Sequence, residues 1–362
     1  MKYKKCCGEI STSGGKTLIS FMIFKYLIDT QGIDNILYIV PSVDLANQSA
    51  VQYERYESYL KKHNHNWEIG ILRSGLRKKQ KAKVESCNIL FGTFQSLCKR
   101  KKEFFDRFGG CICDECHHLG NAASIKNILY NMSNLKYSIG VTGTFPKETM
   151  YENLYIQSVV GPVVYKLTAD QLINTEKRGT PIYAVIQYLK WADQQTKETM
   201  YIYRANKNPM DITAGSKVLK IERKTVNESY TRLKYICDQV INTKKNALVL
   251  FGDIKYGYGK KVYDYIKDNS SKDVYYTDGN TPNKTRDYYK QCMEEDTSGN
   301  TVIVASINTF GEGIDIKNLW SIFLVDTAKS ERLVRQICGR GIRLYPGKDK
   351  VVIFDFVDDI RY

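Results

Sequence analysis

Nine short apolar runs, separated by longer polar stretches, constrain the fold of this 362-residue chain more than any other feature. Each run has the length and the Ile, Val, Leu and Phe content of a strand that is buried on both faces of a parallel sheet. Polar segments of helical length lie between most of them, and this alternation predicts an α/β fold with mainly parallel sheets. The runs are 36–40, 88–91, 110–113, 138–141, 247–251, 274–276, 301–305, 321–325 and 351–354.

The apolar runs fall into two groups, which indicates two domains. Four runs precede residue 145, and the others follow residue 245. Turn-forming Gly and Pro residues at 161–162 and 179–181 lie between the groups. Since domains typically have about 100–200 residues, the length also favours two. We therefore expect one α/β domain over 1–170 and a second over 171–362.

The charge balance predicts a polyanionic partner. The chain has 54 Lys+Arg against 39 Asp+Glu, a net charge of +15, which attracts nucleic acid or an anionic membrane. A membrane span is not expected, because the most apolar stretch, 18–28, is short and interrupted by Lys25. No signal peptide is visible, and the ten cysteines lack the framework of a secreted domain. Reduced thiols and a cytoplasmic location are therefore expected.

A glycine-rich segment at 11–17, Ser-Thr-Ser-Gly-Gly-Lys-Thr, precedes an apolar helix that begins at Leu18. Gly-Lys-Thr at a helix N-terminus is the core of a phosphate-binding loop, in which backbone N–H groups and the helix dipole face the phosphates. Lys16 would reach the β- and γ-phosphates, and the Thr17 hydroxyl would ligate Mg²⁺. The alternative is an ordinary glycine turn that caps a helix, because the strict pattern requires glycine where Ile10 stands.

Two carboxylates, Asp114 and Glu115, end the apolar run at 110–113. Open α/β sheets bind ligands at this end of a strand, where one acid holds Mg²⁺ and the next orients an attacking water. A zinc or iron–sulfur centre is a weaker alternative, because two of its cysteines would share a strand face and no second ligand pair follows. Its candidate ligands are Cys111, Cys113, Cys116, His117 and His118.

Further short segments follow one another in a fixed order. They are Val-Pro-Ser at 40–42, Gly-Thr-Phe-Gln-Ser-Leu at 92–97, Thr-Gly-Thr at 142–144, Phe-Gly at 251–252, a segment at 305–315 that begins Ala-Ser and ends Gly-Glu-Gly-Ile-Asp, and Gln-Ile-Cys-Gly-Arg-Gly-Ile-Arg at 336–343. With the phosphate loop and Asp-Glu-Cys-His at 114–117, they resemble the ordered motifs of superfamily 2 helicases over about 10–358. Within that superfamily the chain most resembles phage recombination helicases of the UvsW type.

The resemblance implies two tandem RecA-like domains that use ATP and Mg²⁺ to move along branched or forked DNA, independently of sequence. The implied nucleotide-binding positions are Ser13, Gly14, Gly15, Lys16, Thr17, Gly313 and Asp315, with Thr17 and Asp114 as Mg²⁺ ligands. The implied catalytic positions are Lys16, Asp114, Glu115, Gln336, Arg340 and Arg343. The implied nucleic-acid contacts are Pro41, Ser42, Thr93, Gln95, Phe251 and Thr309, and Thr142 and Thr144 would couple the two sites.

Two basic runs, 77–83 and 99–102, flank the segment at 92–97. Phosphate contacts explain them under this resemblance, and a solvated lysine-rich surface is the alternative. Membrane becomes the less favoured polyanion, and a monomer is expected.

The chain also departs from the family pattern. Ser11 and Ser13 stand where Pro and Gly are usual. Relatives carry an adenine-contacting segment upstream, and often a substrate-recognition domain there. Only 3–10 precedes the loop, and it reads as a poor strand. These features predict a split, partial or translationally re-started chain.

Three other functions remain open. An RNA helicase is disfavoured because the second motif lacks a final Asp and the third is Thr-Gly-Thr in place of Ser-Ala-Thr. The motor subunit of a restriction system would fit the same motifs, although no nuclease motif is evident. A truncated nucleic-acid-binding protein with an impaired ATPase is the third.

Overall fold

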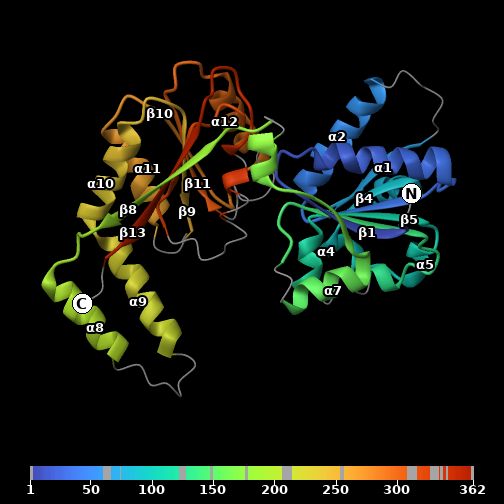
Figure 1. The fold of residues 1–362 in the computed structure, drawn as a ribbon, viewed down its shortest axis with the longest axis horizontal. Helices are drawn as coiled ribbons and strands as arrows, with labels where there is room; N and C mark the ends of the chain where they lie inside the picture. Colours follow the sequence, from blue (N-terminus) through green and yellow to red (C-terminus); the bar gives the residue numbers. More distant parts are fainter. Residues whose placement is uncertain are drawn as a thin grey trace. The chain divides into compact units, whose positions relative to one another are not determined.

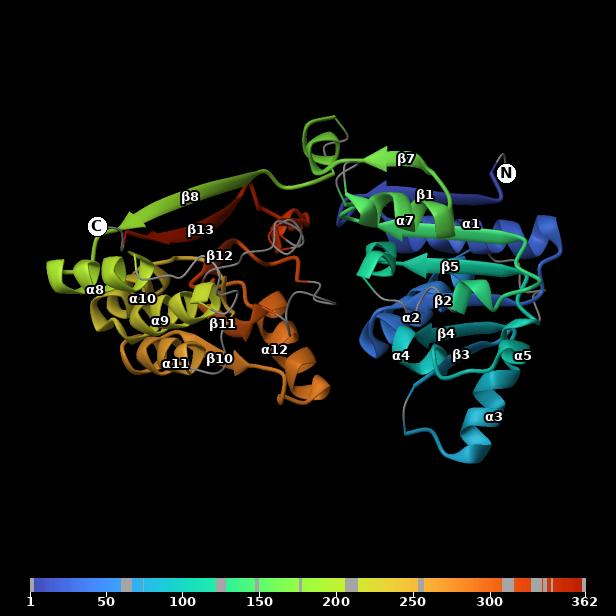
Figure 2. The same cartoon turned by 90° about the horizontal axis from the view of Figure 1, so that it is seen from below.

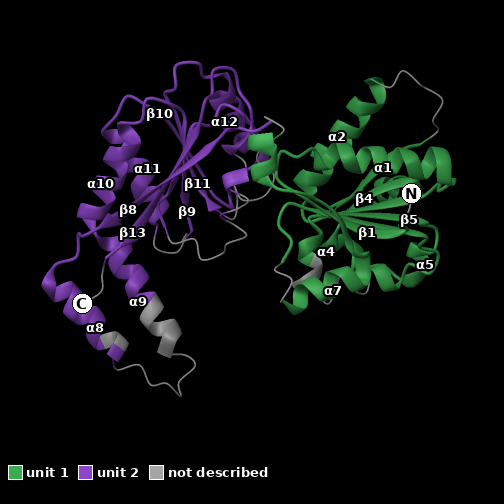
Figure 3. Cartoon of the chain, in the orientation of Figure 1, with its two compact units in different colours: residues 1–177 green, residues 178–362 purple. Residues whose placement is uncertain are grey.

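The computed structural model describes residues 3–59, 67–73, 75–121, 128–146, 150–175, 178–205, 214–252, 257–307, 316–326, 334, 337–339 and 341–359. The chain forms two compact units, 1–177 and 178–362 (Figure 3). The division lies a few residues beyond the boundary expected at residue 170, because the π-helical turn η2 (Gln171–Thr175) belongs to the first unit.

The first unit is built on a seven-stranded sheet in the order β3-β4-β2-β5-β6-β1-β7, and every neighbouring pair is parallel. Four of its strands are the apolar runs expected in this part of the chain. The strands are β1 (Lys5–Ile10), β2 (Ile36–Val40), β3 (Ile69–Leu72), β4 (Ile89–Thr93), β5 (Gly110–Asp114), β6 (Tyr137–Thr142) and β7 (Val163–Leu167).

The segment just before the phosphate loop is a full strand, so the expectation of a poor strand was wrong. β1 lies between β6 and β7 and pairs with both. Its side chains at Cys6, Cys7 and Ile10 are buried. Two small thiols supply the apolar surface that branched side chains usually provide, which is why the segment lacks the sequence pattern of a core strand.

Helices cover both faces of this sheet, as Figure 1 shows. Tyr38 and its alternate neighbours pack against α1 (Lys16–Gln31) and α2 (Val43–Tyr59), whereas Leu37 and Ile39 pack on the opposite face. Strand side chains alternate between faces, so the two apolar sets define two half-cores. The opposite face carries α3 (Lys78–Ser86), α4 (Phe94–Leu97), α5 (Lys102–Phe105) and α7 (Tyr151–Val160).

The second unit is built on a six-stranded parallel sheet in the order β10-β11-β9-β12-β13-β8. Its strands are β8 (Ile182–Leu189), β9 (Ala247–Phe251), β10 (Asp273–Thr277), β11 (Thr301–Ser306), β12 (Ser321–Leu324) and β13 (Val351–Asp358). Its helices are α8 (Gln194–Ala205), α9 (Ala214–Glu228), α10 (Tyr230–Ile241), α11 (Tyr258–Asp268) and α12 (Asn283–Glu295). Figure 1 shows α8 and α9 extending beyond the sheet of this unit.

Two parallel α/β units therefore form the chain, as the alternation of apolar runs predicts. Among the described helices, none is long and apolar enough to cross a bilayer. The ten cysteines are free thiols.

Candidate nucleotide-binding site

Strand order brings the phosphate loop and the acidic pair together. β5, β6 and β1 are consecutive in the sheet, with Asp114 opposite Val141 and Glu9 opposite Thr142. Because all three strands are parallel, their carboxyl ends meet at one edge of the sheet. Ligands of open α/β sheets bind at such an edge.

The loop after β1 has the backbone shape of a phosphate cradle. Gly15 has φ 81°, and Ser13 has φ 71°, a left-handed conformation that disfavours residues with a Cβ. The Gly14 N–H donates to Ser11 O at 2.8 Å. A Cβ at Gly14 would lie 2.7 Å from Ile10 Cγ2, so no side chain fits there. Lys16, which follows Gly15, begins α1, whose N-terminus carries the positive end of the helix dipole.

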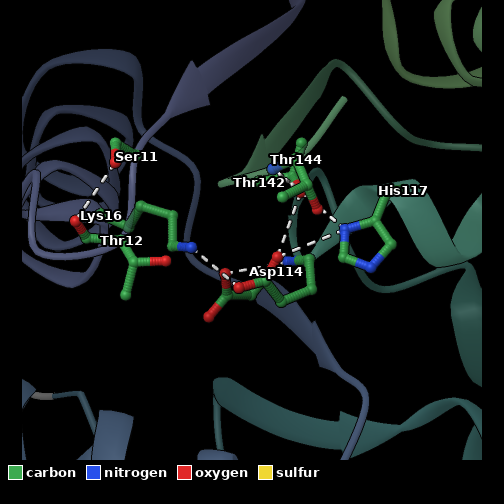
Figure 4. A network of polar contacts seen from close by, with 8 residues as sticks. Ser11, Thr12, Lys16, Asp114, His117, Thr142 and Thr144 are labelled. Atoms are coloured by element: carbon green, nitrogen blue, oxygen red, sulfur yellow. Dashed lines mark hydrogen bonds and ion pairs between the residues drawn. The ribbon is translucent and has the colours of Figure 1, made fainter. Parts of the chain in front are cut away.

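Lys16 and Glu115 form an ion pair across this edge, with 2.8 Å between Nζ and Oε1 (Figure 4). Gly143 leaves space for the lysine, because a Cβ there would lie 3.0 Å from Lys16 Nζ. The long side chain of Lys16 is thus held over the strand ends, within reach of an anion bound in the loop.

The pKa values of the two acids, Asp114 and Glu115, are shifted in opposite directions. The Glu115 N–H donates to Asp114 Oδ1 at 2.9 Å, and Glu115 itself has φ 47°. Burial, together with the neighbouring Glu115 charge, raises the pKa of Asp114 to about 6. Burial opposes ionisation of Glu115 too, but Lys16 and His117 hold its pKa well below the usual range. A bound divalent cation would relieve the cost of two adjacent buried carboxylates.

A buried network joins the acidic pair to the end of β6. Thr142 Oγ1 donates to Glu115 Oε2 at 3.1 Å and accepts the Thr144 N–H at 3.2 Å. His117 Nδ1 lies 2.6 Å from Thr142 Oγ1, and the ring is fully buried (Figure 4). Of the two predicted coupling residues, Thr142 contacts Glu115 directly, and Thr144 is joined to it through Thr142. His117 was not among the predicted site residues, although its place after Asp-Glu-Cys was a signal.

The alternative of a metal centre gains no support. Cys111 and Cys113 pack in the apolar core of the sheet, and burial raises the pKa of both thiols, which disfavours the thiolate that metals bind. Among the described residues, no cluster of three or more His, Cys, Asp and Glu has the arrangement to hold a metal ion.

In the second unit, the described part of the last motif is fixed through its backbone. Lys348 Nζ donates to three carbonyls, those of Lys317, Gly341 and Arg343, at 2.9–3.1 Å. The Thr180 hydroxyl also donates to Arg343 O, at 3.1 Å. Burial lowers the pKa of Lys348 to about 8. The predicted site residues Thr309, Gly313, Asp315, Gln336 and Arg340 lie outside the described residues.

The predicted nucleic-acid contacts of the first unit lie at two neighbouring strand ends. Ser42 follows β2 and Gln95 follows β4, and β2 pairs with β4 up to Val40 and Thr93. Ser42 Oγ accepts the Leu45 N–H at 3.3 Å, and Thr93 Oγ1 accepts the Ser96 N–H at 3.3 Å. Each hydroxyl therefore caps the N-terminus of the helix that follows it, Ser42 that of α2 and Thr93 that of α4. Gln95 is exposed, and Pro41 is half-buried.

Phe251 differs from its predicted role. Its side chain is 1% exposed, stacks on Tyr276 with 5.8 Å between ring centroids, and packs against Gly259 of α11. Among the described residues at this strand end, Gly252 is exposed and its backbone is accessible to a ligand, whereas the Phe251 ring is not. The apolar pattern of β9 already favoured a core role for this ring.

Comparison with known proteins places this geometry in a class. The family described as "Type III restriction enzyme, res subunit" matches residues 2–147, and "Helicase conserved C-terminal domain" matches 231–345. With one match in each unit, the chain has the two tandem RecA-like domains of the superfamily 2 helicase fold and is similar to that class of protein.

Two curated relatives are similar over nearly all of the chain. It is 28% identical over 353 residues to the ATP-dependent DNA helicase uvsW of Enterobacteria phage T4, covering 97% of this chain and 64% of that protein. It is 25% identical over 362 residues to the putative ATP-dependent helicase IRC3 of Saccharomyces cerevisiae, covering 96% and 48%. The chain therefore spans less than two thirds of each relative's length.

A solved structure supports the fold. The ATP-dependent Type ISP restriction-modification enzyme LlaBIII bound to DNA has a TM-score of 0.70 and 18% identity, covering 98% of this chain and 26% of that one. At this identity the likeness concerns the fold alone.

Proposed function

We propose that the chain is an ATP-dependent DNA helicase or translocase that acts on branched or forked DNA, as in phage replication, recombination or repair. The observation that carries the ATPase part is the pairing of Lys16 with Glu115 beside Asp114 at one sheet edge. The DNA part rests on similarity over 97% of the chain to an ATP-dependent DNA helicase.

The residues of the first unit fit a nucleoside triphosphate with Mg²⁺. Gly14 lets the loop pack closely against Ile10, Gly15 has open space where a Cβ would stand, and Lys16 supplies a positive charge. Thr17 and Asp114 are the oxygen donors that a magnesium ion prefers, and Glu115 is ionised to accept a proton from water. Bound ATP and Mg²⁺ would supply the phosphoanhydride and the charge neutralisation for its hydrolysis.

The same residues suggest how hydrolysis would be coupled to movement. Thr142 contacts Glu115 on one side and the Thr144 backbone on the other, so a change at the acid would alter the strand end of β6. In the second unit, Arg343 would add positive charge, and its backbone is held by Thr180 and Lys348. An arginine of this kind is worth about 10³–10⁵ in rate.

ATPase assays with and without forked DNA, on the wild type and on Lys16→Ala, test the proposal. We expect stimulation by DNA and loss of activity in the variant. Absence of stimulation by DNA, or full activity of Lys16→Ala, would contradict the proposal. Unwinding of forked DNA, a four-way junction and duplex RNA with ATP then separates a DNA from an RNA helicase.

A second candidate is a duplex-tracking motor of a restriction system. It is favoured by the family match at 2–147, whose description names a restriction enzyme subunit. Such a motor would displace a triplex-forming strand from duplex DNA without opening a fork. Fork unwinding and triplex displacement are measured on the same protein, one with forked DNA and the other with a DNA triplex.

A further inference from the structure

We infer that a basic platform on the first unit, formed by exposed lysines of α3 and of the α4–α5 turn, binds the phosphates of a duplex arm of DNA. This inference rests on the proposed function and adds a second nucleic-acid surface, away from the strand ends. Residues 73–107 contain eleven Lys and Arg against three Asp and Glu, a net charge of +8 out of +15 for the chain.

The two basic runs are joined into one surface. α3 and the α4–α5 turn cover the same face of the sheet, and Figure 2 shows α3 beside β3, running toward α5. The Glu85 carboxylate, near the end of α3, pairs with Arg100 of the turn at 2.7 Å. The Arg100 guanidinium also lies over the Phe104 ring, 5.3 Å from its centroid. This contact fixes the spacing between the two sets of lysines.

α3 rests firmly on the sheet. A Cβ at Gly70 of β3 would lie 2.6 Å from the Val84 carbonyl of α3, so the helix backbone approaches as closely as glycine permits. A rigid helix presents its charges at fixed positions, which lowers the entropy that binding would cost.

The positions of the lysines in α3 destabilise the helix. Lys78 and Lys79 occupy its first turn, which contains no acid, although the N-terminus of a helix favours negative charge. Lys79 and Lys83 are like charges four residues apart, which destabilises a helix by about 0.2–0.5 kcal/mol. These three side chains are exposed and form no ion pair within the described part of the chain. An external anion would supply the missing negative charge.

The lysines near the α4–α5 turn are also exposed and without an acidic partner among the described residues. These lysines are Lys99, Lys101 and Lys102. Lys99 and Lys101 lie between α4 and α5, and Lys102 is the first residue of α5, so these lysines come four to seven residues after Gln95 at the end of β4.

The missing aromatic surface selects duplex over single strand. Proteins that hold single strands stack bases on exposed aromatic rings. On the platform, the rings of the described residues are buried or half-buried; they are Phe94, Phe104, Phe105 and Phe108. Lysine point charges without stacking rings suit the phosphates of a duplex, which has one charge per about 1.7 Å of axis.

The test is the salt dependence of DNA binding. The variant Lys78→Gln/Lys79→Gln/Lys83→Gln removes three charges of α3. The matched control, Lys244→Gln/Lys245→Gln/Lys267→Gln, removes three exposed lysines of the second unit, two just before β9 and one in the last turn of α11. Fluorescence anisotropy gives the dissociation constant for a fork with a duplex arm, and for a single strand of equal length, between 50 and 200 mM salt.

We expect the slope of log affinity against log salt for the fork to become shallower by about 2.7 in the α3 variant. The affinity loss relative to wild type is then about 40-fold greater at 50 mM than at 200 mM salt. The control variant should keep the wild-type slope. An unchanged fork slope in the α3 variant, or an equal change for the single strand, overturns the inference.

A second variant guards against a local folding effect. Lys99→Gln/Lys101→Gln/Lys102→Gln should also flatten the fork slope, and the melting temperature of the α3 variant should not fall, because like charges are removed. Lysine-dependent binding of wild type to phosphatidylserine vesicles, with an unchanged fork slope, would assign the platform to membrane and overturn the inference. Failure of the proposed function is read separately, as a wild-type ATPase that DNA does not stimulate.

Discussion

Lys16 Nζ lies 2.8 Å from Glu115 Oε1, so the cation of the phosphate loop is paired with an acid from the next strand but one in the sheet. An anion bound in the loop would compete with Glu115 for the Lys16 ammonium group. The ion pair therefore holds, at one edge of the sheet, the two charges that the proposed hydrolysis of ATP would use.

Substitution of the two partners should separate binding from hydrolysis. Lys16→Ala is expected to weaken ATP binding and lower kcat by at least about 10²-fold, because the phosphate charge loses its cation. Glu115→Gln should still bind ATP but hydrolyse it at least about 10²-fold more slowly. Equilibrium ATP binding and single-turnover hydrolysis measure the two effects. Equal loss of binding in both variants would contradict separate roles.

Asp114→Asn should abolish ATPase activity and yet stabilise the nucleotide-free protein at pH 7.5. The folded-state pKa of about 6 lies above the unfolded value of about 3.9, so the folded state holds more protons between these limits. The ionised acid thus costs stability above pH 6, and this cost disappears as the pH falls to 4. Thermal unfolding should show a gain of about 1–3 kcal/mol at pH 7.5 that shrinks at pH 5. The surface variant Asp268→Asn should show no such gain.

Ser13→Gly should raise the free energy of unfolding by about 1 kcal/mol, because glycine adopts φ 71° without strain. Ser13→Ala keeps the Cβ and should not stabilise the protein. Chemical denaturation of both variants checks the difference. If alanine stabilises as much as glycine, the strain does not come from the Cβ.

Lys348→Met should lower kcat more than it raises the KM for ATP, because it frees the backbone on either side of Ile342 without touching the phosphate loop. Steady-state kinetics at saturating DNA measures the division between the two constants. Lys348→Arg retains donors and should recover part of the activity at the same protein stability. A loss of stability alone, with kcat unchanged, would reduce Lys348 to a structural residue.

The two predicted nucleic-acid contacts Gln95 and Phe251 should respond differently. Gln95→Ala is expected to weaken DNA binding at an unchanged melting temperature, because the side chain is exposed. Phe251→Ala should cost about 3–5 kcal/mol of stability, and Phe251→Leu less, with DNA affinity retained in the folded protein. Anisotropy and thermal unfolding on the same samples give both quantities. Lower DNA affinity of stable Phe251→Leu would restore the original prediction.

All nine apolar runs became strands, whereas four strands escaped prediction for a physical reason. β3, β7 and β8 lie at sheet edges, and β7 and β8 carry several exposed side chains, so they lack continuous apolar sequence. β1 is central but is built from small thiols and Gly8. A run of apolar residues predicts a strand only where large side chains are buried on both faces. This method therefore misses strands that lie exposed at a sheet edge and strands whose core residues are small.

Motif order was sufficient to place Lys16, Asp114, Glu115 and Thr142 in one site, because parallel strands bring their carboxyl ends together. The contacts of His117 and Lys348 required the structure. Lys348 belongs to no motif, and a lysine is usually exposed, so its burial could not be read from the sequence; two of its carbonyl partners, Gly341 and Arg343, are near it in the chain, and the third, Lys317, is 31 residues away.

The position of β1 also governs when the nucleotide site can exist during synthesis. β1 leaves the ribosome before both of its neighbours, yet Lys5 pairs with Ser138 and Ile10 with Leu167. The loop that follows β1 is additionally held by the Leu167 carbonyl. A nascent chain therefore exposes its phosphate loop without a fixed shape until β7 has been made. Affinity for nucleotide is then a late property of the growing polypeptide, acquired only when β6 and β7 have paired with β1.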